Sequence, residues 1–285
     1  MKTFSKTPSS SEKLHRVPCP LCGGVNFIPR WEVQGAVFAV CRGCGLTVQN
    51  PRPVAEHLAY RYDDEYFRYE IENEEIFFRL MMLGLEDAAF FTDIAPTLPP
   101  LKRVLDIGCA TGRLLSHFQS LGWETCGVEL CAESAQYGNE RFHVGIQVGN
   151  LPDLNLPAGH FSAVHASHLI EHVDDPVLFV REIASVLAEG GVFICVTPAI
   201  DGFQARFHGK KWRSAIPDHV TLFSKKTLAK LLENAGLKVE TVKTWGGLAA
   251  GTAPLWLKKP ADRWAKVLGW GDVVLMVARK PYTLA

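Results

Sequence analysis

Four cysteines near the start of the chain have the side-chain type and the spacing of a metal site. Cys19 and Cys22 form one C-x-x-C pair, Cys41 and Cys44 form another, and a glycine follows each pair. Four thiolates give Zn²⁺ a closed tetrahedral shell, so such a metal is structural rather than catalytic. A redox C-x-x-C would not require two copies. The pattern predicts a zinc ribbon over residues 18–53, a segment too small to fold without its metal.

A second stretch whose residues could form a ligand-binding site is Val104–Gly112 (VLDIGCATG), in which small residues follow a short apolar run. The run predicts a buried strand with Asp106 near its end, and residues 113–121 show helical spacing up to Gly122. A strand, a small-residue turn and a helix form the first unit of a Rossmann-like sheet, where backbone can approach a ligand closely. Arg113 occupies the last glycine position of the Gly-x-Gly-x-x-Gly fingerprint, which disfavours a dehydrogenase.

An acid follows this turn at a distance that suits a ribose. Glu129 ends the predicted second strand, residues 124–129, about twenty residues beyond the turn, where a carboxylate accepts from ribose hydroxyls. Asn150 and Leu151 follow a predicted third strand at residues 145–149.

Three histidines are candidates for proton transfer, because the ordinary pKa of histidine lies near neutrality. His168 and His172 follow the predicted fourth strand, residues 161–167, at the carboxyl end of the sheet where open α/β sheets bind ligands. His219 lies after a basic run over residues 206–213. We take His172, His219 and His168 as candidate bases, although each could instead only brace its loop.

Composition excludes few classes of function. The chain has 285 residues, no formal net charge and 47% hydrophobic residues, so nothing global points to nucleic acid or an anionic membrane. Its first residues lack the apolar core of a signal peptide, and residues 1–17 are predicted to be a disordered tail. Residues 244–257, the most apolar uncharged run, are too short and too broken by Gly and Pro to span a bilayer. We expect a cytoplasmic protein.

The segment over residues 54–98 is rich in Tyr, Phe and acids, and residues 54–99 carry a net charge of −8. An apolar stripe at helical spacing predicts a helical connector packed on the sheet. The alternative is a lid over the substrate, with Tyr62, Tyr66 and Tyr69 facing the ligand.

The rest of the chain alternates helices and strands. Helices are predicted at residues 132–141, 177–187 and 224–235, strands at 192–197, 238–245 and 272–278, and a turn at Gly190–Gly191.

With these pieces in place, the chain resembles class I S-adenosylmethionine-dependent methyltransferases that carry an N-terminal four-cysteine zinc ribbon. The resemblance rests on the Val104–Gly112 motif and on three further stretches, LIEHVDDP, LAEGGVFICVTP and DHVTLFSKKTLAKLLENAGLKVE. It implies an α/β fold with a Rossmann-like seven-stranded methyltransferase sheet. The implied domains are a tail (1–17), a zinc ribbon (18–53), a helical connector or lid (54–98) and the methyltransferase domain (99–285).

The resemblance also implies two cofactors, S-adenosyl-L-methionine and structural Zn²⁺. The cofactor-binding positions are then Asp106, Gly108, Cys109, Ala110, Thr111, Gly112, Glu129, Leu130, Asn150, Leu151, Ser167 and His168, and the metal ligands are Cys19, Cys22, Cys41 and Cys44.

The implied acceptor is a small molecule or a carrier-linked glycan, lipid or secondary metabolite. Residues 203–221 favour an anionic one, because they supply Arg206, Lys210, Lys211 and Arg213 beside Phe207 and Trp212. A solvated loop whose aromatic side chains seal the sheet edge is the alternative.

Two other functions stay open, an RNA methyltransferase that uses the basic ribbon and a non-catalytic S-adenosylmethionine-binding protein. Against a nucleic-acid acceptor, the fourth strand is followed by His168-Leu-Ile and not by the N/D-P-P-Y/F motif of amino-nucleobase methylation.

Overall fold

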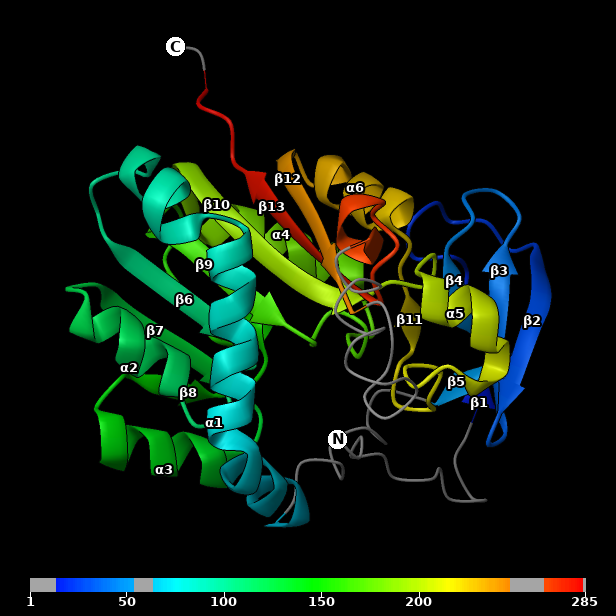
Figure 1. The fold of residues 1–285 in the computed structure, drawn as a ribbon, viewed down its shortest axis with the longest axis horizontal. Helices are drawn as coiled ribbons and strands as arrows, with labels where there is room; N and C mark the ends of the chain where they lie inside the picture. Colours follow the sequence, from blue (N-terminus) through cyan, green and yellow to red (C-terminus); the bar gives the residue numbers. More distant parts are fainter. Residues whose placement is uncertain (1–13, 54–63, 247–263, 284–285) are drawn as a thin grey trace.

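The computed structural model describes residues 14–53, 64–246 and 264–283 (Figure 1). Its main element is a seven-stranded sheet in the order β12-β13-β10-β9-β6-β7-β8. The strands are β6 (Arg103–Ile107), β7 (Glu124–Glu129), β8 (Ile146–Val148), β9 (Phe161–Ser167), β10 (Leu187–Pro198), β12 (Lys238–Trp245) and β13 (Val273–Arg279). β13 runs antiparallel to both of its neighbours, and the pairs from β10 through to β8 are parallel. The expected seven-stranded sheet is confirmed.

Helices cover both faces of this sheet. One face carries α1 (Asp64–Asp87), α2 (Arg113–Ser120) and α3 (Ala132–Phe142), and the other carries α4 (Pro176–Val186) and α6 (Lys225–Asn234). Strand residues therefore alternate between two apolar cores. In β10, Ile194 and Val196 face the first core, whereas Phe193 and Cys195 face the second. Shorter elements complete this part: η3 (Phe90–Ile94), η4 (Ala95–Thr97), η5 (Leu151–Asp153), α5 (Phe203–His208) and η6 (Gly209–Lys211).

The N-terminal segment forms a second, smaller sheet that is joined to the first unit. β2 (Phe27–Val33), β3 (Ala36–Cys41) and β4 (Thr47–Gln49) are antiparallel neighbours, and the edge beyond β4 is taken by β11 (Thr221–Leu222) from the C-terminal half of the chain. Figure 1 shows this sheet beside α5, on the far side of the molecule from α2 and α3. The sheet of the predicted ribbon is thus completed by Thr221 and Leu222, which lie opposite Val48 and Thr47.

Two local expectations differ from the structure. Leu14–His15, expected in the tail, forms β1 and pairs with β5 (Arg52–Pro53). Gly190–Gly191, expected as a turn, lies inside β10, where the register with β9 shifts between Leu187 and Val192 and Gly190 has a φ of 76°. The glycine pair therefore makes a bulge in a longer strand and does not end a helix.

Candidate functional site

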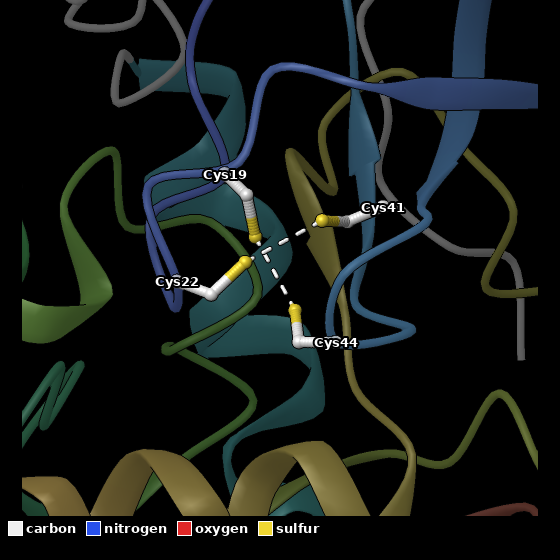
Figure 2. A group of neighbouring side chains, drawn as sticks. All are labelled: Cys19, Cys22, Cys41 and Cys44. Atoms are coloured by element: carbon white, nitrogen blue, oxygen red, sulfur yellow. Dashed lines mark hydrogen bonds between the residues drawn. The ribbon is translucent and has the colours of Figure 1, made fainter.

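The four N-terminal cysteines come together as a cluster (Figure 2). Their side chains point toward a common centre, and the Sγ atoms of Cys19 and Cys44 lie 3.5 Å apart, as do those of Cys22 and Cys41. A disulfide requires about 2.05 Å between sulfurs, so these pairs are not disulfides. A tetrahedral Zn²⁺ with bonds of about 2.3 Å separates its sulfurs by about 3.8 Å, close to the observed spacing. The four side chains therefore fit a structural zinc ion.

The protonation of these thiols also favours a metal. Burial opposes ionisation of Cys41, but hydrogen bonds from the main-chain N–H groups of Cys44 and Gly43 and from the neighbouring thiols of Cys22 and Cys19 bring its pKa to about 7. Burial raises the pKa of Cys19 and of Cys44 above the ordinary value. Since thiolates are the ligands of zinc, a bound cation would supply the charge that keeps these buried sulfurs ionised.

The small-residue turn after β6 has the backbone that the sequence predicts. Gly108, Ala110 and Gly112 have φ values of 68°, 50° and 73°. At Gly112 an added Cβ would lie 2.8 Å from Cγ2 of Val144, so positive φ and close packing both require glycine there. The Gly108 N–H donates to the carbonyl of Val128 at 2.8 Å, which fixes the turn against the end of β7.

Glu129 joins this turn to the next helix. Its Oε2 accepts from the Ala110 N–H at 2.9 Å, and its Oε1 accepts from the N–H groups of Leu130 at 2.8 Å and Cys131 at 2.9 Å. Burial raises the pKa of Glu129, although these three N–H groups act in the opposite direction. A carboxylate has roughly four lone-pair sites, so about one remains for a ligand hydroxyl. The residues present thus fit the ribose of S-adenosylmethionine at this position.

Asp106, also expected to bind the cofactor, is instead buried in a pair that the sequence did not indicate. Its Oδ1 lies 2.7 Å from Nδ1 of His165, and both side chains are almost fully buried. The two residues face each other across β6 and β9. The sequence signal for this pair would have required the strand register.

The remaining expected cofactor residues lie along the same carboxyl edge of the sheet. Leu130 is 37% exposed directly after β7, Asn150 is exposed before η5, and Leu151 is buried. Ser167 ends β9, and His168 follows with a φ of 54°. The side chains of Cys109 and Thr111 are buried, so these two residues can meet a ligand only through main-chain groups.

The loop after β9 brings the candidate catalytic residues to this edge. Nδ1 of His172 lies 2.9 Å from the carbonyl of Asp218, and Nδ1 of His219 lies 2.8 Å from that of Ser214. Because a carbonyl only accepts, both Nδ1 atoms carry the hydrogen and both Nε2 atoms are left as acceptors. The two rings meet edge to face at 4.7 Å.

Glu171 completes this cluster and was missed by the sequence analysis. It is fully buried, its Oε2 accepts from Oγ1 of Thr197 at 2.8 Å, and its Oε1 lies 3.3 Å from Nδ1 of His168. Ligand-type atoms of Glu171, His172 and His219 lie within 4.8 Å of one another, so this group could also hold a cation. The LIEHVDDP motif contains Glu171, but its spacing alone did not show that the side chain turns inward.

His219 and His172 differ in their burial and in their electrostatic surroundings. Burial opposes ionisation of Glu171, but the hydrogen bond from His168 and the neighbouring imidazoles bring its pKa to about 2. Burial, reinforced by His172, lowers the pKa of His219 to about 3. His219 is therefore neutral near pH 7 and enclosed, which favours a supporting role, whereas His172 is only half-buried and more accessible.

A family model described as a methyltransferase domain matches residues 79–242, more than half of the chain. The match includes the turn after β6, Glu129 and the cluster around Glu171. The chain belongs to the class I S-adenosylmethionine-dependent methyltransferases.

Individual relatives of this methyltransferase agree with that assignment. A ubiquinone biosynthesis O-methyltransferase of Xanthomonas axonopodis pv. citri is 33% identical over 159 residues, which are 50% of this chain and 66% of that protein. A probable S-adenosylmethionine-dependent methyltransferase of Mycolicibacterium smegmatis is 30% identical over 140 residues, 49% of this chain and 53% of that protein. The chain thus spans between about half and two thirds of these curated relatives.

The fold agrees with a solved structure. A methyltransferase of Thermotoga maritima, described as a possible histamine N-methyltransferase, has a TM-score of 0.55 at 23% identity and covers 79% of this chain and 98% of its own. No helix among the described residues of this methyltransferase is long and apolar enough to cross a membrane.

Helix α1 lies beside α3 and Glu129. Glu70 is buried and accepts a hydrogen bond from Oγ of Ser134 in the first turn of α3. Burial and the nearby Glu129 raise the pKa of Glu70 to about 8. No sequence signal distinguished Glu70 from the many acids around it, since only the packing of α1 buries it.

The lid interpretation of this segment stays a prediction. Tyr66 and Tyr69 are half-buried, and Tyr62 lies outside the described residues. The guanidinium of Arg113 packs over the ring of Phe78 at 4.2 Å, which ties α1 to α2.

In the basic segment after β10, Arg206 and Phe207 are exposed, whereas Trp212 and Arg213 differ from expectation. Trp212 is buried, meets Trp31 of the ribbon at 6.5 Å and donates to Asp272, so its face is not available to a ligand. Arg213 pairs with Asp272 at 2.6 Å. Lys210 and Lys211 are exposed and remain candidates for an anionic acceptor.

Proposed function

We propose that this protein transfers the methyl group of S-adenosylmethionine to an oxygen or nitrogen of a small-molecule or carrier-linked acceptor. The proposal rests on one contact at the carboxyl edge of the sheet, between the turn after β6 and the loop after β9. A Cβ at Gly108 would lie 3.3 Å from the side chain of Leu169, so the loop bearing His172 packs directly against the turn that is expected to hold the cofactor.

In this proposal the cofactor rests on the turn after β6, with its ribose on Glu129. Bound S-adenosylmethionine supplies an electrophilic methyl group, and the protein has to align donor and acceptor and remove a proton. Nε2 of His172 is the proton acceptor, because its Nδ1–H is held by the carbonyl of Asp218. The His219 ring packs edge to face against this imidazole at 4.7 Å, and ligand-type atoms of Glu171 and His172 lie within 4.8 Å of each other.

An anionic acceptor is supported by the exposed Lys210 and Lys211. An oxygen acceptor is supported by the name of the Xanthomonas relative, an O-methyltransferase of ubiquinone biosynthesis.

The test is a screen of phenols, sugar nucleotides, amines and RNA with S-adenosylmethionine, scored by S-adenosylhomocysteine release. Replacement of His172 by Asn should reduce turnover by 10²–10⁴-fold, the usual contribution of general base catalysis, with cofactor affinity unchanged. The matched control is His143→Asn, at an exposed histidine far from the cluster. Release that depends on RNA, or equal turnover in the two variants, would contradict the proposal, and cofactor binding without any turnover would favour a non-catalytic protein.

The charge of the acceptor is tested by replacing Lys210 and Lys211 with Ala. We expect the KM of the acceptor to rise and the Kd of the cofactor to stay constant. The control replaces Lys226 and Lys230, two exposed lysines of α6, in the same way.

A further inference from the structure

The zinc ribbon is bonded to the strand that follows the histidine cluster. β4 of the ribbon pairs antiparallel with β11, so that Val48 lies opposite Thr221. The N–H of Gln49 donates to the carbonyl of Val220 at 2.8 Å. The main chain directly after His219 is therefore part of the ribbon sheet.

A second link runs from the ribbon to the loop that carries His172. Arg52, in β5, has a side chain only 7% exposed. Its Nη2 donates to the main-chain carbonyl of Asp174 at 3.0 Å and lies 2.9 Å from the Asp174 carboxylate. One guanidinium nitrogen thus holds both the backbone and the side chain of a residue two positions after His172.

Burial of the Arg52 guanidinium would be energetically unfavourable if this side chain served only to stabilise the fold. Nε and Nη1 of Arg52 are buried and have no hydrogen-bond partner within the described part of the chain. A buried cation with unsatisfied donors is weak evidence for stabilisation, since an apolar side chain of similar size often serves as well. The charged guanidinium of Arg52 is nevertheless present where this side chain contacts the loop that carries His172.

The two links hold the same loop from opposite ends. The N–H of Thr221, in β11, donates to the carbonyl of Glu171 at 3.1 Å, and His172 bonds the carbonyl of Asp218 just before β11. The Arg52 contact then fixes Asp174. The position of the His172 ring is thus set by main-chain and side-chain bonds that trace back to β4 and β5.

We propose that the zinc ribbon is a positioning part of the active site, and that Arg52 is the positioning residue that sets the loop bearing His172. This inference rests on the proposed role of His172 in methyl transfer. It gives the ribbon a task in the reaction without any contact with cofactor or acceptor.

The test compares Arg52→Met, which keeps the bulk and removes both the hydrogen bond to the Asp174 carbonyl and the ion pair with its carboxylate, with Arg52→Lys, whose ammonium can replace both contacts. The control is Arg42→Met, at an exposed arginine of the same ribbon. The zinc-loaded proteins are labelled with ¹³C at histidine Cε1, and the His172 resonance is assigned by its loss in His172→Asn. We expect Arg52→Met to move this resonance, Arg52→Lys to restore it and Arg42→Met to leave it in place.

Turnover with the acceptor identified in the screen should fall on the order of tenfold to a hundredfold in Arg52→Met, because small misplacements of a catalytic group are that costly. Cofactor affinity and zinc content should stay at the wild-type values. If Arg52→Met loses zinc or does not fold, Asp174→Asn carries the test, since it weakens the same contact from the more exposed partner, whose side chain is 39% exposed.

An unchanged His172 resonance in both Arg52→Met and Asp174→Asn would overturn the proposal. A shifted resonance with no turnover by the wild-type protein on any acceptor would support the positioning and refute the proposed function instead. The two ideas therefore fail separately.

Discussion

Replacement of Glu129 by Gln tests the assignment of the cofactor site most directly. The wild-type carboxylate accepts three main-chain N–H groups, from Ala110 to Oε2 and from Leu130 and Cys131 to Oε1. A glutamine placed with its oxygen at the Oε1 position keeps the last two bonds. Its NH₂ group then faces the Ala110 N–H, donor against donor, and offers no acceptor to a ribose hydroxyl.

The magnitude follows from these contacts. A hydrogen bond from a ligand hydroxyl to a charged group contributes about 1.5–3 kcal/mol, so losing it should weaken cofactor binding by roughly 10- to 150-fold. The unpaired Ala110 N–H costs about 1–3 kcal/mol of folding free energy. Because burial raises the pKa of Glu129, the neutral amide recovers part of this cost. The effect on binding should therefore exceed the effect on stability.

Isothermal titration calorimetry with S-adenosylmethionine measures the first quantity, and urea unfolding measures the second. The matched control is Glu124→Gln, at the other end of β7, where the side chain is 70% exposed and pairs with Arg103. An affinity of Glu129→Gln within about twofold of the wild-type value, below the weakest bond considered, would refute the assignment. Equal losses in both variants would point to a general effect on the strand.

Three further predictions test the turn, the metal and the buried cluster. Gly112→Ala should destabilise the protein by about 2–5 kcal/mol in urea, from positive φ and a Cβ 2.8 Å from Val144, whereas Gly122→Ala, also at positive φ but with nothing within 4 Å, should cost only about 1–2 kcal/mol. Metal analysis should find one zinc per chain, and Cys41→Ser should lower the zinc content and destabilise the ribbon before cofactor affinity changes; protein purified under reducing conditions with no zinc would contradict this. The pKa of Glu171, about 2 in the folded protein against an ordinary 4.5, stabilises the fold above pH 4.5, and this contribution should be lost as the pH falls from 4.5 toward 2. Glu171→Gln should flatten that part of the curve of unfolding free energy against pH.

The sequence alone determined the features that depend on near neighbours in the chain. The turn Val104–Gly112 was predictable because positive φ and close backbone approach demand small residues at fixed spacing. The alternation of strands and helices followed from apolar runs that alternate with helical patterns, and the cysteine cluster from two short pairs. In each case the physical constraint acts over a few residues, so it leaves a local pattern.

The tertiary structure alone decided which distant side chains meet. Asp106 and His165 form a pair because β6 and β9 share one register, and a shift by one residue would turn His165 to the other face. Trp212 is buried rather than available to a ligand because the ribbon packs over it. Arg52 reaches Asp174, 122 residues away, only because β4 accepts β11 at its edge. Such contacts depend on strand register and on the packing of separate elements, and neither is written in the spacing of residues along the chain.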